Sequence, residues 1–182
     1  MTQKLIGNKE SKIKTFFKVK AIYIVMIVTV LGLFGGIPSV FFLFSKTIIG
    51  IGEVLILLTF SSILGLLQWK YLKNLLEIEY RNFVMYAFAG FGMCLLSFLL
   101  YLNYIITIES NQQTYTIDRI SVHYGEYDIT LVGEDVNLDL ERVISSYATE
   151  HYEIIPVSSK VKVFSQKGIL GFSRVKKCVF ER

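Results

Sequence analysis

Three apolar runs dominate the first part of the chain and predict membrane-spanning helices. Residues 21–45 and 83–107 carry no charged side chain, and residues 47–68 carry a single one, Glu53. A helix of about twenty apolar residues is long enough to cross the hydrocarbon core of a bilayer. We therefore expect three transmembrane helices, at about 21–45, 47–69 and 83–107.

The middle of the first run leaves two interpretations open. Gly35, Gly36 and Pro38 interrupt the run, so the helix either kinks there or ends between Gly35 and Pro38. A cleaved signal peptide is disfavoured, because its apolar core would be only about 7–15 residues long and a small-residue cleavage site would follow it. We expect the first run to be a retained helix.

After residue 107 the pattern becomes that of a small water-soluble domain. Residues 114–124 and 127–131 are rich in β-branched and aromatic side chains and alternate as strands do, with a turn at Gly125–Glu126 between them. The apolar positions of the first of these strands slip phase once along its length. That slip predicts a β-bulge at Asp118–Arg119.

A helix and three further strands complete this domain. An apolar stripe at helical spacing predicts the helix, and it consists of Leu140, Val143, Ile144 and Tyr147. Residues 152–157, 160–165 and 172–180 have strand character, and a hairpin at 166–171 joins the last two. The predicted fold class is thus a three-helix transmembrane bundle followed by a small soluble α+β domain, in the order ββαβββ, with one helix on an antiparallel sheet.

Composition supports this division of the chain. Hydrophobic residues make up 53% of the 182 residues and charged residues 19%. We expect a basic cytoplasmic segment at 1–20, a transmembrane region at 21–107 and an exported soluble domain at 108–182. The last part holds eleven Asp and Glu against nine Lys and Arg. It has no basic stripe interleaved with aromatic residues, so nucleic acid is not an expected partner.

Basic residues near the predicted helix ends indicate the orientation. Nine lie on the side of the N-terminus and the second loop, namely Lys4, Lys9, Lys12, Lys14, Lys18, Lys20, Lys70, Lys73 and Arg81. Two, Lys46 and Arg119, lie on the opposite side. Loops that stay in the cytoplasm carry the excess of Lys and Arg. We therefore expect a multi-pass protein of the cytoplasmic (inner) membrane, with its N-terminus inside and its C-terminal domain outside.

Glu53 is the candidate polar site of the membrane region. A carboxylate within the bilayer is costly, which makes it a functional candidate by default. If the second helix begins near Gly50 or Ile51, however, Glu53 lies in its first turn, where it reaches water and the positive end of the helix dipole. We expect this interfacial role rather than a proton or ion site.

Pairs of small residues four positions apart are candidates for helix packing. They are Gly32 and Gly36, Ser61 and Gly65, and Gly90 and Cys94. Such pairs let helix backbones approach closely in a membrane, where the hydrophobic effect does not drive helices together. We expect them to pack the three helices on one another, with homo-oligomer formation as the second interpretation.

Chemical motifs are not found in the sequence. The cluster of Asp135, Asp139 and Glu141 lacks the turn glycine and terminal glutamate of a calcium loop. Cys94 and Cys178 fall in different predicted media, which disfavours a disulfide and a cysteine-based zinc site. We expect no catalysis, no metal ion and no cofactor.

The hypothesis that follows is an integral membrane accessory or interaction protein. Its helices would lie in the lipid bilayer, and its small extracytoplasmic domain would contact a protein partner in the membrane or envelope. The alternatives are an oligomeric transport or channel component that uses the transmembrane helices, and a membrane-embedded enzyme. Neither the partner nor the physiological process can be read from these residues.

The orientation generates a first prediction. A phosphatase fused after Arg182 should be active, because the C-terminal domain is expected outside the cytoplasm, and a fluorescent reporter that matures only in the cytoplasm should be dark at the same site. The reverse pattern would contradict the topology and imply an even number of spans.

Overall fold

Three long apolar helices form the first part of the chain. The computed structural model describes residues 22–76, 79–133, 136–152, 155 and 159–181. Within them, three helices are long and apolar enough to cross a membrane, Ile22–Lys46, Ile51–Leu72 and Tyr80–Ile105. The predicted segment 1–20 lies outside the described residues.

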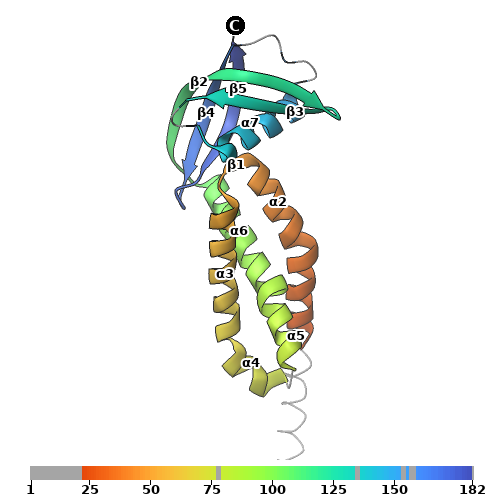
Figure 1. The fold of residues 1–182 in the computed structure, drawn as a ribbon. Coiled ribbons are helices and arrows are strands. Elements are labelled where there is room, and N and C mark those ends of the chain that lie inside the picture. The colour runs from red at the N-terminus through yellow and green to blue at the C-terminus, as the bar shows by residue number, and fades with distance from the viewer. Residues whose placement is uncertain (1–21, 77–78, 134–135, 153–154, 156–158, 182) are drawn as a thin grey trace, which may run out of the picture. The chain divides into compact units, whose positions relative to one another are not determined.

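The regular elements follow one another in a simple order (Figure 1). The helical ones are η1 (Gly32–Gly36), α2 (Ile37–Lys46), α3 (Ile51–Leu67), α4 (Trp69–Leu76), α5 (Tyr80–Met85), η2 (Tyr86–Gly92), α6 (Met93–Ile105) and α7 (Leu138–His151). The strands are β1 (Thr47–Ile48), β2 (Thr107–His123), β3 (Glu126–Val132), β4 (Lys160–Gly168) and β5 (Ser173–Glu181). We call the region from β2 to β5, Thr107–Glu181, the head.

The first helix does not end at its glycines and proline. It runs from Ile22 to Lys46, and the stretch Gly32–Gly36 is a turn of π-helix. Pro38 stands at the second position of α2, where the preceding wide turn makes the missing N–H less costly than it would be inside a regular α-helix.

The chain divides into two compact units that do not match a simple helix-then-head division. One unit comprises Met1–Pro38 and Leu55–Ser97, and the other comprises Ser39–Val54 and Phe98–Arg182. The head therefore belongs to the same unit as the last turns of the first and third helices and the loop between the first two helices. The change in composition at residue 107 is therefore not the limit of a compact unit.

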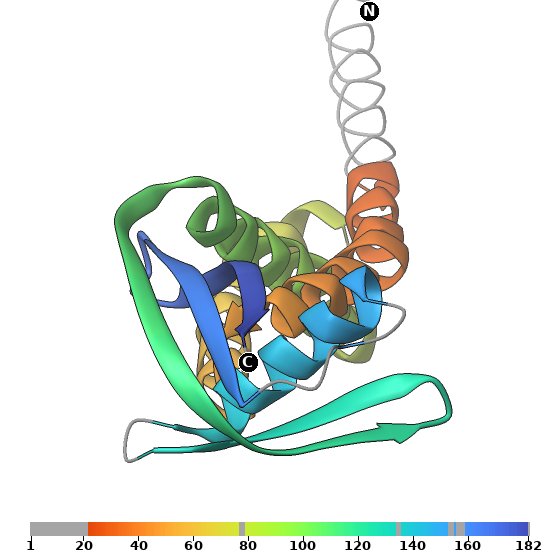
Figure 2. The ribbon, with the colours of Figure 1, turned by 90° about the horizontal axis from the view of Figure 1, so that it is seen from above.

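The head is built on a five-stranded antiparallel sheet with the strand order β1-β5-β4-β2-β3. The long strand β2 bends along its length and pairs with β4 in its first half and with β3 in its second (Figure 2). Its first half was not expected to be a strand, because Thr107–Gln113 is polar and has no apolar alternation.

The prediction of a strand at residues 152–157 is wrong at the two positions that the structure describes. Tyr152 and Ile155 belong to no strand, and the other four residues lie outside the described part. Tyr152 is the C-cap of α7, and its hydroxyl donates to the carbonyl of Cys178 at 3.0 Å. The strand-forming side chains of Tyr152 and Ile155 contact β5 and the core without pairing in the sheet. The remaining strand of the sheet is β1, which comes from the loop between the first two helices.

Two local predictions within the β2–β3 hairpin have different outcomes. The register shifts between Ile117 and Arg119, which confirms the bulge. The turn was placed one residue too late. His123 pairs with Glu126, and the two residues between them, Tyr124 and Gly125, have φ angles of 54° and 85°.

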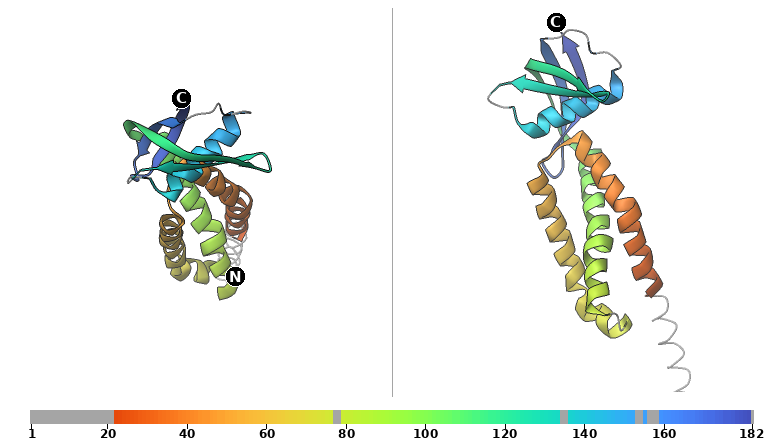
Figure 3. Two further views of the ribbon diagram at one scale, coloured as in Figure 1. Left: turned by 45° about the horizontal axis from the view of Figure 1, so that its top comes forward. Right: turned by 45° about the vertical axis from the view of Figure 1, so that its right-hand side comes forward.

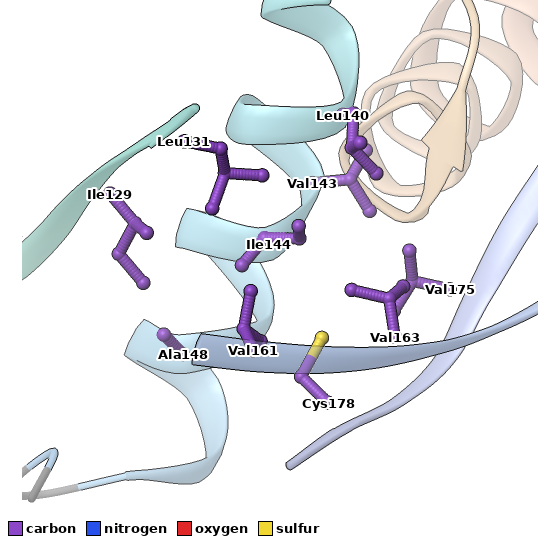
Figure 4. Packing of buried hydrophobic residues seen from close by; sticks show 10 residues of the cluster. All are labelled: Ile129, Leu131, Leu140, Val143, Ile144, Ala148, Val161, Val163, Val175 and Cys178. Atoms are coloured by element: carbon purple, nitrogen blue, oxygen red, sulfur yellow. The ribbon is translucent and has the colours of Figure 1, made fainter. Parts of the chain in front are cut away.

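The core of the head lies between α7 and one face of the sheet (Figures 3 and 4). The predicted stripe is confirmed, since Leu140, Val143 and Ile144 are buried and Tyr147 packs against them. The sheet contributes Ile129, Leu131, Val161, Val163, Val175 and Cys178. Burial raises the pKa of the Cys178 thiol to about 12, so this cysteine is an unreactive core residue.

The polar face of α7 covers the free edge of the sheet. Strand β3 has a neighbour on one side only. On its other side the N–H groups of residues 127, 129 and 131 donate to Thr149 Oγ1 (2.9 Å), Ser145 Oγ (3.0 Å) and Glu141 Oε1 (2.7 Å).

The distance between successive outward N–H groups of a strand nearly equals the rise of four residues along a helix. Four helical residues advance about 6 Å, and two strand residues about 6.8 Å. A helix running antiparallel to β3 can therefore offer one acceptor to each outward N–H group. Unpaired strand edges recruit other strands, so α7 both completes the core and protects β3 from such pairing.

The core generates a second prediction. Ile144 is fully buried, so Ile144→Ala should cost roughly 2–5 kcal/mol of the stability of the head. Because small domains often have only about 5 kcal/mol in total, limited proteolysis of the intact protein should remove the mutant head and spare the wild type. Leu138→Ala is the matched control, since Leu138 lies on the same helix and is 83% exposed. Equal resistance of the Ile144→Ala and Leu138→Ala heads would contradict the assigned core.

Candidate functional site

The loop between the first two helices contains β1, which is an edge strand of the sheet of the head. Thr47 pairs with Arg174 and Ile48 with Ser173, both on β5. Thr47 and Ile49 are only 3% and 2% exposed. A strand of two residues has few ladder hydrogen bonds, so its stability depends on the side chains around it.

Arg142 of α7 supplies the strongest of these contacts. Its Nη2 donates to the carbonyl oxygens of Thr47 (3.2 Å) and Ile49 (2.9 Å). The guanidinium lies over the ring of Phe44, 3.5 Å from the centroid, and 3.5 Å from the carboxylate of Asp139. Burial lowers the pKa of Arg142, and Asp139 opposes that shift. The side chain stays charged, and hydrogen bonds to a charged donor contribute about 1.5–3 kcal/mol.

A second contact joins the end of α2 to the end of α7. Lys46 Nζ lies 2.8 Å from Glu150 Oε2 and 4.8 Å from the ring centroid of Phe42. Both members of the ion pair are partly exposed, so the pair contributes less than about 1 kcal/mol. It orients Lys46 more than it stabilises the fold.

Asn103, near the end of α6, fixes the β4–β5 turn. Its side chain is 2% exposed. The amide Nδ2 donates to the carbonyl of Phe172 at 3.2 Å, and Oδ1 accepts from the N–H of Leu170 at 2.9 Å. A Cβ on Gly168 would lie 2.0 Å from the Asn103 carbonyl oxygen, so only glycine permits this approach. The third helix thereby meets the sheet through specific hydrogen bonds.

Arg174 adds a contact between the same helix and β5. Its guanidinium lies 4.4 Å from the ring centroid of Tyr104. Nη2 and Nε donate to Gln166 Oε1 at 2.6 and 3.1 Å. We call this set of contacts, made by Arg142, Lys46, Asn103 and Arg174, the junction. All of it lies within one compact unit.

Glu53 lies beside the junction, in the first turn of α3, and its side chain is exposed. A Cβ on Gly50 would lie 2.3 Å from Glu53 Oε2 and 3.2 Å from Asp139 Oδ2. Carboxylates from the second helix and from α7 thus both border Gly50. Among the described residues no three His, Cys, Asp or Glu form a group that could bind a metal ion, and Asp135 lies outside them.

The candidate helix-packing residues all belong to the other compact unit. Gly32 and Gly90 are buried where two backbones approach, since a Cβ on Gly32 would lie 2.2 Å from the Ala89 carbonyl oxygen and one on Gly90 3.0 Å from Thr29 Cα. These two glycines lie in the π-helical segments η1 and η2. Wide π turns and glycines together allow the first and third helices to approach.

The other four packing candidates show looser contacts. A Cβ on Gly36 would lie 3.1 Å from Met93, and one on Gly65 3.1 Å from Ala87. Cys94 Sγ is 3.8 Å from the Val28 carbonyl oxygen, and Ser61 is fully buried. Gly36, Gly65 and Cys94 thus lie beside residues of another helix in the same chain, and homo-oligomer formation stays a prediction.

Sequence reasoning missed the junction. Three of its acceptors are backbone carbonyls, which have no sequence signature. The two partners of Arg142 are 93 and 95 residues away from it along the chain. A signal did exist for Asn103, because an amide inside the third apolar run needs polar partners when it is buried. That signal predicts a buried contact but not the identity of the partner.

The junction combines charge-assisted hydrogen bonds, guanidinium–ring stacking and a strand pairing. Comparison of the chain with protein-family models, with curated proteins and with solved structures found no match. The functional argument therefore rests on the geometry of the unit that contains the head.

Arg142 generates a third prediction. Arg142→Gln removes two charge-assisted hydrogen bonds and the stack on Phe44, so the head should open more often, by about tenfold or more. Alkylation of Cys178, followed by mass spectrometry, reports this opening because the thiol is buried in the folded head. Arg119→Gln is the control, since Arg119 is an exposed arginine of the same head. If the Arg142→Gln protein is labelled as slowly as the Arg119→Gln protein, the junction does not stabilise the head.

Proposed function

We propose that the chain is an integral membrane accessory protein that presents its head to another protein of the envelope. The three apolar helices anchor it in the bilayer, and the distribution of Lys and Arg favours a cytoplasmic N-terminus and an extracytoplasmic head. The proposal concerns presentation and binding.

The observation that carries the proposal is the junction. A head that only needed an anchor could follow the third helix through a flexible linker. Here β2 begins two residues after α6 ends, Asn103 binds the β4–β5 turn, and the first interhelical loop is a strand of the sheet. The head is thus bonded directly to the last turns of two helices and to the loop between the first two, within one compact unit. Direct bonding of this kind is more than an anchor alone requires, and it suits a head that is held for contact with a partner.

The tip of the β2–β3 hairpin is the best candidate for the contact with the partner. Tyr124 is completely exposed and its backbone is in the left-handed region, with φ at 54°. Asn or Gly is preferred at such a turn position, and a bulky residue there costs roughly 1 kcal/mol. A strained backbone at an exposed tyrosine supports a functional role, and tyrosine is enriched among the residues that dominate protein interfaces.

Strand addition at β3 is not the binding mode that the structure favours. The N–H groups of residues 127, 129 and 131 already donate to α7. A partner strand would have to displace α7 and expose the core. The partner is therefore expected to contact side chains at the hairpin tip.

The transport alternative has less support. Glu53 is exposed in the first turn of α3, where it needs no further partner, and the small-residue pairs pack within the chain. A conduction path would require additional subunits, and none of the described contacts favours them specifically.

Tyr124 generates a fourth prediction. Tyr124→Asn creates an Asn-Gly turn, so the hairpin should become more stable by about 1 kcal/mol while partner binding is lost. Tyr124→Phe keeps the ring and should retain most of the binding. The measurement is photocrosslinking in cells from a reactive residue at 122, followed by purification in mild detergent.

Two outcomes of the crosslinking experiment show whether the hairpin tip contacts the partner. A crosslinked envelope protein that is lost in Tyr124→Asn and kept in Tyr124→Phe supports the proposal. Crosslinking that is identical in all three proteins, with normal head stability, would show that the tip is not the contact.

A further inference from the structure

A cavity of about 280 Å³ opens where the ends of the helices meet the head. Its walls are the end of α2, Tyr104 of α6, one face of α7 and residues 174–176 of β5. All of these belong to one compact unit. Pockets for small ligands measure roughly 300–1,000 Å³, so the cavity suits a small polar group and not a whole lipid or cofactor.

The lining of this cavity has an excess of positive charge. Lys46, Arg174 and Lys176 face one carboxylate, Glu150, which leaves two positive charges in excess. Glu150 pairs with Lys46 at 2.8 Å, whereas Arg174 donates to the uncharged Gln166. Three cations in one small cavity repel one another, and an anion would relieve that repulsion.

Hydroxyl groups and an imidazole add to the lining, namely those of Ser45, Tyr104, Ser146, Tyr147 and His151. The Ser45 hydroxyl donates to the Phe42 carbonyl at 2.9 Å, and His151 Nδ1 lies 3.0 Å from the Tyr147 carbonyl oxygen. The imidazole of His151 stacks on Tyr147 with its ring centroid 4.0 Å away. Hydroxyl and ammonium groups around one space match the acceptor oxygens of a phosphate group.

A β-bulge determines which lysine reaches the cavity. In the pairing of β4 with β5, Phe164 pairs with Lys177 and Ser165 with Val175, so Lys176 is the extra residue. Bulges re-aim side chains. Lys176 lines the cavity, and Lys177, which is also exposed, does not. The two adjacent lysines thus differ in placement while sharing charge and exposure.

The exposed aromatic residues near the cavity indicate that the anion belongs to a lipid. Next to the cavity, Phe41 and Phe42 of α2 and Tyr101 of α6 are 70%, 55% and 54% exposed. Aromatic side chains near the ends of transmembrane helices lie at the level of the lipid headgroups. A cationic cavity at this level meets the phosphate of a phospholipid, whose oxygens accept charge-assisted hydrogen bonds.

We propose that this cavity binds the phosphate-bearing headgroup of an anionic phospholipid. The lipid tails would extend along the exposed apolar residues of α2 and α6. The inference goes beyond the proposed partner binding and does not require it, because it rests only on insertion of the helices. Binding here would also tie Lys46, Tyr104 and Arg174 of the junction to the lipid surface.

The test compares two single-charge variants of the full-length protein in detergent. Native mass spectrometry measures the retention of phosphatidylglycerol and of phosphatidylcholine by the wild type, Lys176→Gln and Lys177→Gln. We expect the wild type to prefer phosphatidylglycerol. Lys176→Gln should lose about fivefold in its retention, the contribution of one lysine near an anionic lipid, while Lys177→Gln matches the wild type.

Folding and the source of the anion are controlled separately. Alkylation of Cys178 should be equally slow in both variants, which shows that the head is intact. Inorganic phosphate added without lipid tests the soluble alternative. A phosphate adduct that depends on Lys176 and displaces the lipid would assign the cavity to a soluble anion and overturn the lipid proposal.

Two further results would also overturn it. One is equal retention of the two lipids by the wild type. The other is an equal loss in Lys176→Gln and Lys177→Gln, which would reflect the general charge of the head. Failure of the Tyr124 experiment would leave the lipid result unaffected, so the two proposals can fail independently.

Discussion

The arrangement of the head depends on one constraint, which is that a two-residue strand between two apolar helices must be stable. Thr47 and Ile48 pair with β5, but a pairing this short cannot persist by itself. Arg142 stabilises it by donating to the carbonyl of Thr47, within the strand, and to that of Ile49, directly after it, while it stacks on Phe44. Because Arg142 lies on α7, the helix that closes the core also binds the loop between the first two helices.

The two edges of the sheet are completed by different means, and both involve α7. At one edge, side chains of α7 accept the outward N–H groups of β3. At the other edge, β1 pairs with the start of β5, and Arg142 binds the carbonyls of the loop. β1 pairs with Ser173 and Arg174 of β5, so it covers that edge in part. The accessible chemistry of the head does not depend on adding a strand at the edge of β3. It is found at the hairpin tip, where Tyr124 is exposed, and in the cationic cavity at the helix ends.

Local features of the fold could be predicted from the sequence, because their signals lie within a few residues. The stripe that includes Val143 and Ile144 repeats with the helical period, and the bulge at Asp118–Arg119 shows as a slip in alternation. The strand β1 could not be predicted, because two residues have no period and their stability comes from Arg142, about ninety positions away. Residues 152–157 were misassigned for a related reason. Tyr152 and Ile155 have strand-forming side chains, but they pack against the core and β5 without joining the sheet.

The candidate site was predictable to a smaller extent than the fold. Glu53 was expected in the first turn only if its helix began near Gly50 or Ile51 and not at residue 47, and α3 begins at Ile51. Its proximity to Asp139 around Gly50 depends on the tertiary fold. The small-residue pairs could be selected because a spacing of four shows in the sequence. The cationic cavity leaves none, since Lys46, Arg174 and Lys176 come from segments that only the junction brings together.

Hydrogen exchange of the purified protein in nanodiscs tests the central claim most directly. That claim is that the loop between the first two helices folds as one unit with the head. Exchange should be measured for peptides that cover Thr47–Ile49 and for peptides that cover the core strands around Val163 and Val175. If the loop and head form one cooperative unit, the loop amides that pair with β5 should be protected within about tenfold of the core amides and should lose protection together with them. Loop amides that exchange as fast as those of the exposed tip at Tyr124 and Gly125, while the core stays protected, would contradict the account.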